Sequence, residues 1–246
     1  MSLPEIVTRE QWLTARKEFL AREKAFTRAR DALNAERRRL PMVRVDKEYT
    51  FESTQGQSRL GDLFAGQRQL IVQHVMFDPS WEDACPGCTA GVDETPDALL
   101  NHLRVRDTEF VLVSRTPLEK IEKYRERRGW SIPWYSSFGS DFNYDFHVSL
   151  DPAKAPVEFN YRDEAELRRA GMEWILEGPS EQPGVSCFLR DGEDVFHTYS
   201  TFARGTDHLG GSYALLDLTA LGRQEAWEEP KGRSDNPRGA DPTFTS

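Results

Sequence analysis

The N-terminal segment carries large apolar residues at a regular spacing of seven. It starts at Thr8 with the sequence TREQ, a capping-box pattern in which Gln11 reaches back to the Thr8 amide. The apolar positions that follow are Trp12, Phe19, Phe26, Leu33 and Leu40. This pattern predicts a helix of about 30 residues that carries one apolar seam and ends before Pro41.

Two interpretations of this seam stay open. The helix packs on its own domain, or it pairs with a second copy of the chain, which a narrow heptad stripe favours. Residues 8–40 hold ten Lys and Arg against five Asp and Glu, in a chain whose net charge is −9. The basic helix is therefore expected to be attracted to an acidic body or partner.

The first half of the remaining chain alternates between strand-like and helix-like patterns. The nearly continuous apolar run at residues 70–77 is typical of a central strand buried on both faces. The other elements predicted here are a strand or hairpin over 42–53, a helical turn over 60–69, a helix over 88–104, a second buried strand over 109–115, and a helix that begins at Pro117 and stops at Gly129.

The second half predicts a hairpin and a last helix. Residues 184–201 form a strand pair that turns at Asp191-Gly192, and residues 212–227 form a helix. An aromatic segment over 131–159 lies before them. The element order is β-α-β-α, an insert, then β-β-α, which predicts one mixed sheet with helices on both faces.

Composition and charge narrow the class of protein. The chain has 246 residues, 38% hydrophobic and 30% charged, with three cysteines. No apolar run approaches the roughly 20 residues of a membrane span, and the N-terminus lacks the pattern of a signal peptide. An acidic chain is a poor binder of nucleic acid. We expect a reducing cytoplasmic location, where a close cysteine pair is more often catalytic or metal-binding than structural.

Two of the cysteines, Cys85 and Cys88, lie in the stretch DACPGCTA. Cys85 is expected to follow the end of a central strand and to precede a helix, where unpaired N–H groups favour a thiolate. Cys88 lies about one helical turn further on and can attack a mixed disulfide. Cys85 is thus the expected nucleophile and Cys88 the resolving thiol. Because Glu82 and Asp83 oppose a second negative charge, only a moderate lowering of the Cys85 pKa is expected.

Other interpretations of the cysteines stay open. A zinc or iron–sulfur site needs two more ligands, and the five histidines are scattered without paired spacing. Two inert buried thiols are a further alternative. Cys187 lies in a predicted strand and is expected to be a small core residue.

Five sequence blocks resemble a known family. They are HVMFDPSWEDACPGC, LVSRTPLEKIEKYRERRGW, PWYSSFGSDFNYDFHVS, PGVSCFLRDG and VFHTYSTFARG, and they resemble the domain-of-unknown-function family eight-nine-nine. The resemblance covers nearly the whole chain. It implies a thioredoxin-like fold and a dithiol–disulfide oxidoreductase activity.

The chain departs from the broader relatives of that family. Ala84 precedes the first cysteine, and Pro86-Gly87 separates the pair, whereas thioredoxins resemble Trp-Cys-Gly-Pro-Cys. Glu82 stands where peroxiredoxins place a Thr, so peroxidase activity is less expected. Pro183 is the best match to the cis-proline that faces the cysteines in thioredoxins.

Further residues are candidates for supporting the cysteines or binding substrate. Arg115 ends the second buried strand, and an Arg close to Cys85 would stabilise its thiolate. The aromatic segment over 131–159 is either a satellite core or an apolar wall near the cysteines. The full set of supporting candidates is Trp81, Arg115, Pro183, Tyr199 and Arg204.

Together these patterns predict an α/β protein with a thioredoxin-like (peroxiredoxin-like) mixed sheet flanked by helices and an N-terminal helical arm. Residues 1–41 form the arm, 42–227 the thioredoxin-like domain and 228–246 a polar tail. The expected function is thiol–disulfide exchange with an unknown thiol or disulfide substrate; the alternative is a catalytically inactive binding or scaffold protein. No cofactor or metal, no nucleic acid and no membrane is expected to take part.

The apolar seam generates a test of self-association through the arm. Replacing both Phe19→Glu and Phe26→Glu places charges in the seam, so a dimer held by it should shift toward monomer. The mass in solution, measured by light scattering, reports this shift. A wild-type protein that is already monomeric, with a mass unchanged by the substitutions, would mean that the helix does not pair.

Overall fold

A computed structural model describes residues 3–209 continuously, and also residues 211, 216, 218, 219, 225–229, 231 and 237. The chain divides into two compact units, one including Met1–Met42 and the other including Val43–Ala214. The helix predicted over 212–227 and the tail predicted over 228–246 fall largely outside the described residues.

The first unit contains the predicted long helix, α1 (Arg9–Arg37). Its capping box is formed as expected, because Oγ1 of Thr8 accepts from the Gln11 amide and Oε1 of Gln11 accepts from the Thr8 amide. No residue of α1 is buried. Pairing of the apolar seam with another chain therefore stays a prediction.

The second unit is built on an eight-stranded sheet, counted over the described residues. In spatial order the strands are β1 (Val43–Arg44), β10 (Asp194–Phe202), β9 (Gly184–Asp191), β4 (Gln69–His74), β5 (Thr108–Ser114), β6 (Trp134–Ser136), β2 (Thr50–Ser53) and β3 (Gly56–Arg59).

Strand directions make this a mixed sheet. β4 is parallel to β5, and β5 is parallel to β6, whereas β9 is antiparallel to both β4 and β10. The order β10-β9-β4-β5, with a helix between β4 and β5, is that of a thioredoxin-like fold. The fold class expected from the sequence is confirmed, because the apolar run at residues 70–77 supplies the central strand β4.

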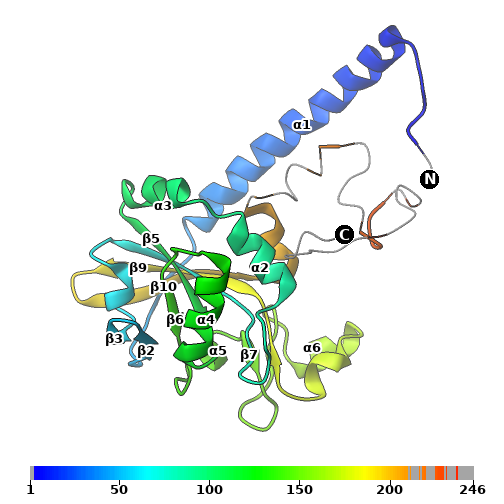
Figure 1. The fold of residues 1–246 in the computed structure, drawn as a ribbon. Coiled ribbons are helices and arrows are strands. Elements are labelled where there is room, and N and C mark those ends of the chain that lie inside the picture. The colour runs from blue at the N-terminus through cyan, green and yellow to red at the C-terminus, as the bar shows by residue number, and fades with distance from the viewer. Residues whose placement is uncertain are drawn as a thin grey trace. The chain divides into compact units, whose positions relative to one another are not determined.

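Helices cover both faces of the sheet (Figure 1). On one face α2 (Pro86–Asp93), α3 (Asp97–Arg104) and α4 (Leu118–Arg128) bury an apolar cluster that includes Cys88, Leu112 and Trp134. On the other face η1 (Asp62–Phe64) and α5 (Phe142–Asp145) enclose a second cluster that includes Val72 and Phe142.

A smaller third cluster lies beside the end of β10. It buries Val148, Leu167 and Phe202. The elements around it are β7 (Ser149–Leu150), which pairs with β8 (Ser180–Glu181), α6 (Glu164–Arg169), η2 (Glu173–Leu176) and η3 (Ala203–Leu209).

Two expected elements differ in detail from the structure. The single helix predicted over 88–104 is wrong: α2 begins at Pro86, and Pro96 starts α3 as its N-cap. Proline has no N–H and clashes with a preceding helical turn, so the helix breaks there. The hairpin turns at Gly192-Glu193, because Asp191 still pairs with Asp194. Gly192 supplies the positive φ of this two-residue turn.

Two further segments are split between separate parts of the fold, which the sequence pattern did not indicate. They are residues 42–53 and residues 131–159. The predicted strand or hairpin becomes β1 at one edge of the sheet and β2 near the other, and β2 forms its hairpin with β3. The aromatic segment supplies β6, which is not an edge strand, since β2 pairs beside it. Side chains of the aromatic segment are buried on both faces of the sheet. Trp134 lies in the apolar cluster that contains Cys88, and Phe142 lies in the cluster on the opposite face.

The aromatic segment generates a matched stability test. Phe142 is fully buried, whereas Phe138 is 49% exposed. Phe142→Ala should lower the free energy of unfolding by about 3–5 kcal/mol, because it removes a large side chain and leaves a cavity. Phe138→Ala should change it by less than about 0.5 kcal/mol. Urea unfolding followed by circular dichroism measures both values; equal losses would contradict this division of the segment.

Candidate redox site

Cys85 lies where the end of β4 meets the start of α2. Its backbone N–H donates to the carbonyl of Met76 at 2.9 Å, which holds Cys85 beside the end of the central strand. Its own carbonyl accepts from the Thr89 amide at 2.9 Å in the first helical bond. Cys85 is the N-cap residue of α2, with Pro86 at the first helical position. The expected order of strand end, cysteine and helix is confirmed.

The loop before Cys85 is tied to α4. Nζ of Lys120 donates to the backbone carbonyls of Pro79, at 2.9 Å, and Trp81. The partly buried side chain of Trp81 packs against the apolar cluster that contains Cys88. Nothing in the helical pattern KIEK distinguishes Lys120 from its neighbours, so the sequence did not indicate this contact.

Hydrogen bonds stabilise the thiolate of Cys85. The side chain of Cys88 has the largest effect on the Cys85 pKa, and the backbone N–H groups of Cys88 and Gly87 add to it. Burial acts in the opposite direction, and the result is a Cys85 pKa lowered to about 6. Cys85 is therefore largely ionised at pH 7.

Cys88 differs from Cys85 in both exposure and acidity. It is buried, whereas Cys85 is half-buried; Cys187 is also half-buried, so it is not the core residue expected from the sequence. Its hydrogen bond to Cys85, burial and the nearby Cys85 charge raise the Cys88 pKa well above its ordinary value. The two thiols thus share one proton, which stays on Cys88 and is donated toward Cys85. Cys85 is thus the more acidic thiol, as its expected role as nucleophile requires, but its pKa is lowered further than the moderate shift expected from the sequence.

Asp83, two residues before Cys85, opposes the Cys85 thiolate less than its position suggests. Asp83 forms an ion pair with Arg127 of α4. A paired carboxylate presents little net charge to its surroundings, so its repulsion of a neighbouring thiolate is reduced. The helix α2 itself is joined to α4 by a hydrogen bond of 2.8 Å between Oγ1 of Thr89 and the hydroxyl of Tyr124.

Arg115 is held by acidic partners. Its guanidinium contacts Glu181 at 2.7 Å and Asp78 at 3.1 Å, and it donates to Oγ of Ser149 at 3.2 Å. Burial raises the pKa of Glu181, and the charge of Arg115 counteracts that effect. Arg115 therefore anchors the start of the cysteine loop through Asp78 and is not among the groups that shift the Cys85 pKa.

The other supporting candidates lie just before β9, on β10 and in η3. Pro183 directly precedes β9, whose first residue, Gly184, pairs with His74 at the end of β4. Tyr199 pairs in register with Cys187, and Arg204 forms an ion pair with Asp207. Their roles at the cysteines stay predictions.

Among the described residues, no group of three or more His, Cys, Asp or Glu side chains is arranged to hold a metal ion. In the same part of the chain, no helix is long and apolar enough to cross a membrane.

The fold and the cysteine pair define a thioredoxin-like protein with a vicinal dithiol at a helix N-terminus. The chain belongs to the family described as bacterial protein of unknown function (DUF899), whose model matches residues 1–239. The resemblance expected from the sequence is thereby confirmed. No curated protein matches significantly.

Solved structures give distant similarities. Bacterioferritin comigratory protein of Xanthomonas campestris is 14% identical, with a TM-score of 0.39 and coverage of 64% of this chain and 80% of that one. Peroxidoxin BcpB of Mycobacterium tuberculosis is 16% identical, with a TM-score of 0.36 and coverage of 65% and 86%. A protein from Bacteroides thetaiotaomicron described as a disulfide isomerase is 17% identical, with a TM-score of 0.35 and coverage of 66% and 82%. At such low sequence identities and TM-scores, these similarities do not indicate the activity of this protein.

The effect of the Cys88 hydrogen bond on the Cys85 pKa can be tested by measuring the reactivity of Cys85 against pH. In a Cys187→Ser background, the alkylation rate of Cys85 should rise through a midpoint near pH 6 and level off above it. Cys88→Ala removes the donor with the largest effect, so the midpoint should move to higher pH. Cys88→Ser keeps a donor and should move it less. Iodoacetamide labelling followed by mass spectrometry measures the midpoints; identical values in all three proteins would contradict the hydrogen-bond assignment.

Proposed function

We propose that this protein is a thiol–disulfide oxidoreductase in which Cys85 is the nucleophile and Cys88 the resolving thiol. The observation that supports it most is the asymmetry of the pair. Cys85 is accessible and acidic at the start of α2, and Cys88 is buried and holds the shared proton. A thiolate is the reactive form of cysteine in disulfide exchange, so the two side chains are suited to different steps.

Reduction of a substrate proceeds in two exchanges. The Cys85 thiolate attacks one sulfur of a substrate disulfide, a mixed disulfide forms, and the other substrate sulfur leaves as a thiolate. Cys88 then loses its proton and attacks Sγ of Cys85, which releases the second substrate sulfur and closes the Cys85–Cys88 disulfide. The protein gives up two electrons and the substrate gains them. An external dithiol reverses both exchanges and restores the reduced pair.

The hydrogen bond between the thiols supports this order of events. Once Cys85 is consumed in a mixed disulfide, its negative charge is gone, and one of the effects that raise the Cys88 pKa disappears with it. Cys88 is therefore easier to deprotonate when it is needed as the attacking group. No organic cofactor takes part, because the sulfur atoms carry the electrons.

Trapping of the intermediate tests the assignment. Cys88→Ser treated with a small disulfide of two monothiols should accumulate a mixed disulfide at Cys85, because no second thiol is present to resolve it. Cys85→Ser should accumulate few, since Cys88 is buried and protonated. Intact-mass spectrometry counts the adducts. Wild-type protein under mild oxidation should lose two protons on the single peptide that carries both cysteines. If both thiols stay free while Cys187 reacts, the proposed function is wrong.

A further inference from the structure

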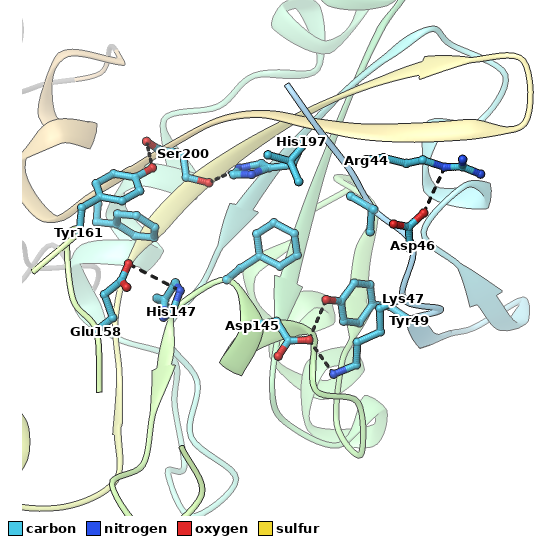
Figure 2. Close-up of a pocket in the computed structure, with 14 residues that line it drawn as sticks. Arg44, Asp46, Lys47, Tyr49, Asp145, His147, Glu158, Tyr161, His197 and Ser200 are labelled. Carbon is cyan, nitrogen blue, oxygen red and sulfur yellow. Dashed lines mark hydrogen bonds and ion pairs between the residues drawn. The ribbon is translucent and has the colours of Figure 1, made fainter. Parts of the chain in front are cut away.

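A cavity of about 370 Å³ lies on the face of the sheet that does not carry the cysteines. Its lining includes Tyr49 and Phe146, which belong to the apolar cluster with Val72, whereas Cys88 belongs to the cluster on the other face. Small-molecule sites in proteins commonly measure about 300–1,000 Å³ and have mostly apolar walls. Figure 2 shows His147, Glu158, Tyr161 and Ser200 toward one end of the cavity, and Lys47, Tyr49 and Asp46 toward the other.

A β-bulge shapes the wall formed by β10. His197 pairs with Phe188 and Tyr199 pairs with Cys187, so Thr198 is an extra residue on this strand. In a regular strand, residues three apart point to opposite faces. The extra residue places His197 and Ser200 on the same face, where Nε2 and Oγ lie 2.8 Å apart. Bulges often re-aim side chains beside functional sites.

This wall continues into the core as a hydrogen-bonded chain of uncharged side chains. Oγ of Ser200 lies 2.8 Å from Oγ of Ser186, which lies 2.9 Å from Nε2 of His74. Burial lowers the pKa of His74 to about 3, and burial also lowers the pKa of His197. Both imidazoles are therefore neutral at pH 7, and this wall offers a ligand no cation.

Two residues that line the cavity adopt an unusual backbone conformation. His147 has φ of 53° and Tyr161 has φ of 62°, in the left-handed region that side chains larger than glycine rarely adopt. The hydroxyl of Tyr161 donates to the carbonyl of Ser200 at 2.9 Å, which fixes its ring against this wall. Such conformations persist where the surroundings impose them, and they gather at ligand sites.

The charges around the cavity favour a cation over an anion. Its two permanent cations are already paired: Arg44 contacts Asp46 and Asp194, and Lys47 contacts Asp141 and Asp145. An anionic ligand would have to displace these carboxylates.

Glu158 is the carboxylate of the lining that lacks a close cation. Its Oε1 lies 3.7 Å from Nε2 of His147, beyond hydrogen-bond distance, and His147 is charged only if protonated. A ligand ammonium could pair with this carboxylate in a cavity that is also lined by the aromatic rings of Phe146, Tyr161 and Phe202.

We propose that this cavity binds a small organic cation, a primary ammonium on an apolar body of about the size of one aromatic ring. The ammonium contacts Glu158, and the apolar body lies against Phe146, Tyr161 and Phe202. Attraction between a cation and aromatic faces adds to the ion pair. The site is separate from the cysteine pair and does not depend on the function proposed for it.

Three probes of one shape test this assignment in the wild-type protein. They are phenethylamine, phenylethanol and phenylpropanoate, which differ mainly in carrying a positive, a neutral or a negative end. Titration calorimetry and ligand-detected NMR should show the tightest binding for phenethylamine and the weakest for phenylpropanoate. Equal binding of all three, tighter binding of the anion, or no binding of phenethylamine at millimolar concentration would overturn the proposal.

Charge variants at Glu158 locate the site. Glu158→Gln should weaken phenethylamine binding about two- to fivefold, the loss of one partly exposed ion pair. Glu158→Lys should reverse the preference, so that phenylpropanoate binds more tightly than phenethylamine. Glu193→Gln removes an exposed carboxylate in the β9–β10 turn and should leave binding unchanged. Cys85→Ser should also bind phenethylamine as the wild type does, which separates this test from that of the cysteines. Unchanged binding in both Glu158 variants would overturn the proposal.

Discussion

Hydrogen bonding of β4 on both of its edges is the constraint on which the rest of the second unit depends. β4 is paired with parallel β5 on one side and antiparallel β9 on the other, over the whole length from Gln69 to His74. A strand held in this way cannot slip in register without exposing its buried set, here Leu70 and Val72. Its carboxyl end is therefore a fixed point, and the carbonyl of Met76 binds the Cys85 amide just beyond it.

The two thiols acquire different chemistry from that fixed point. Cys85 stops at the N-cap of α2, where backbone N–H groups face its sulfur, and Cys88 enters the apolar cluster under the helix. Desolvation opposes the charged form of both, but hydrogen bonds outweigh it only at Cys85. Contacts from α4 then hold the helix and the preceding loop in place, through Tyr124, Lys120 and Arg127. A difference of one helical turn thus becomes a difference in exposure and acidity.

The opposite face of the sheet carries polar chemistry of another kind. A buried His–Ser–Ser–His chain runs across β4, β9 and β10 and ends at an open cavity. Buried polar groups are tolerated when they bond to one another, and here the uncharged state of both imidazoles avoids the larger cost of a buried charge. His74 lies on the same strand that leads to Cys85, so β4 supports the cysteine pair on one face of the sheet and this polar chain on the other.

The sequence by itself determined the features that depend on local pattern. The capping box at Thr8, the central apolar strand, the glycine that ends α4 and the strand–cysteine–helix order all follow from residues close together in the chain. Only the tertiary structure decided which distant groups meet. The pairing of Asp83 with Arg127, the engagement of Arg115 by Glu181, and the cavity between His147 and Lys47 join segments that no periodicity relates. The bulge at Thr198 shows the physical reason, because one extra residue reverses which face a side chain occupies, and cross-strand register is a property of the assembled sheet rather than of the sequence of one strand.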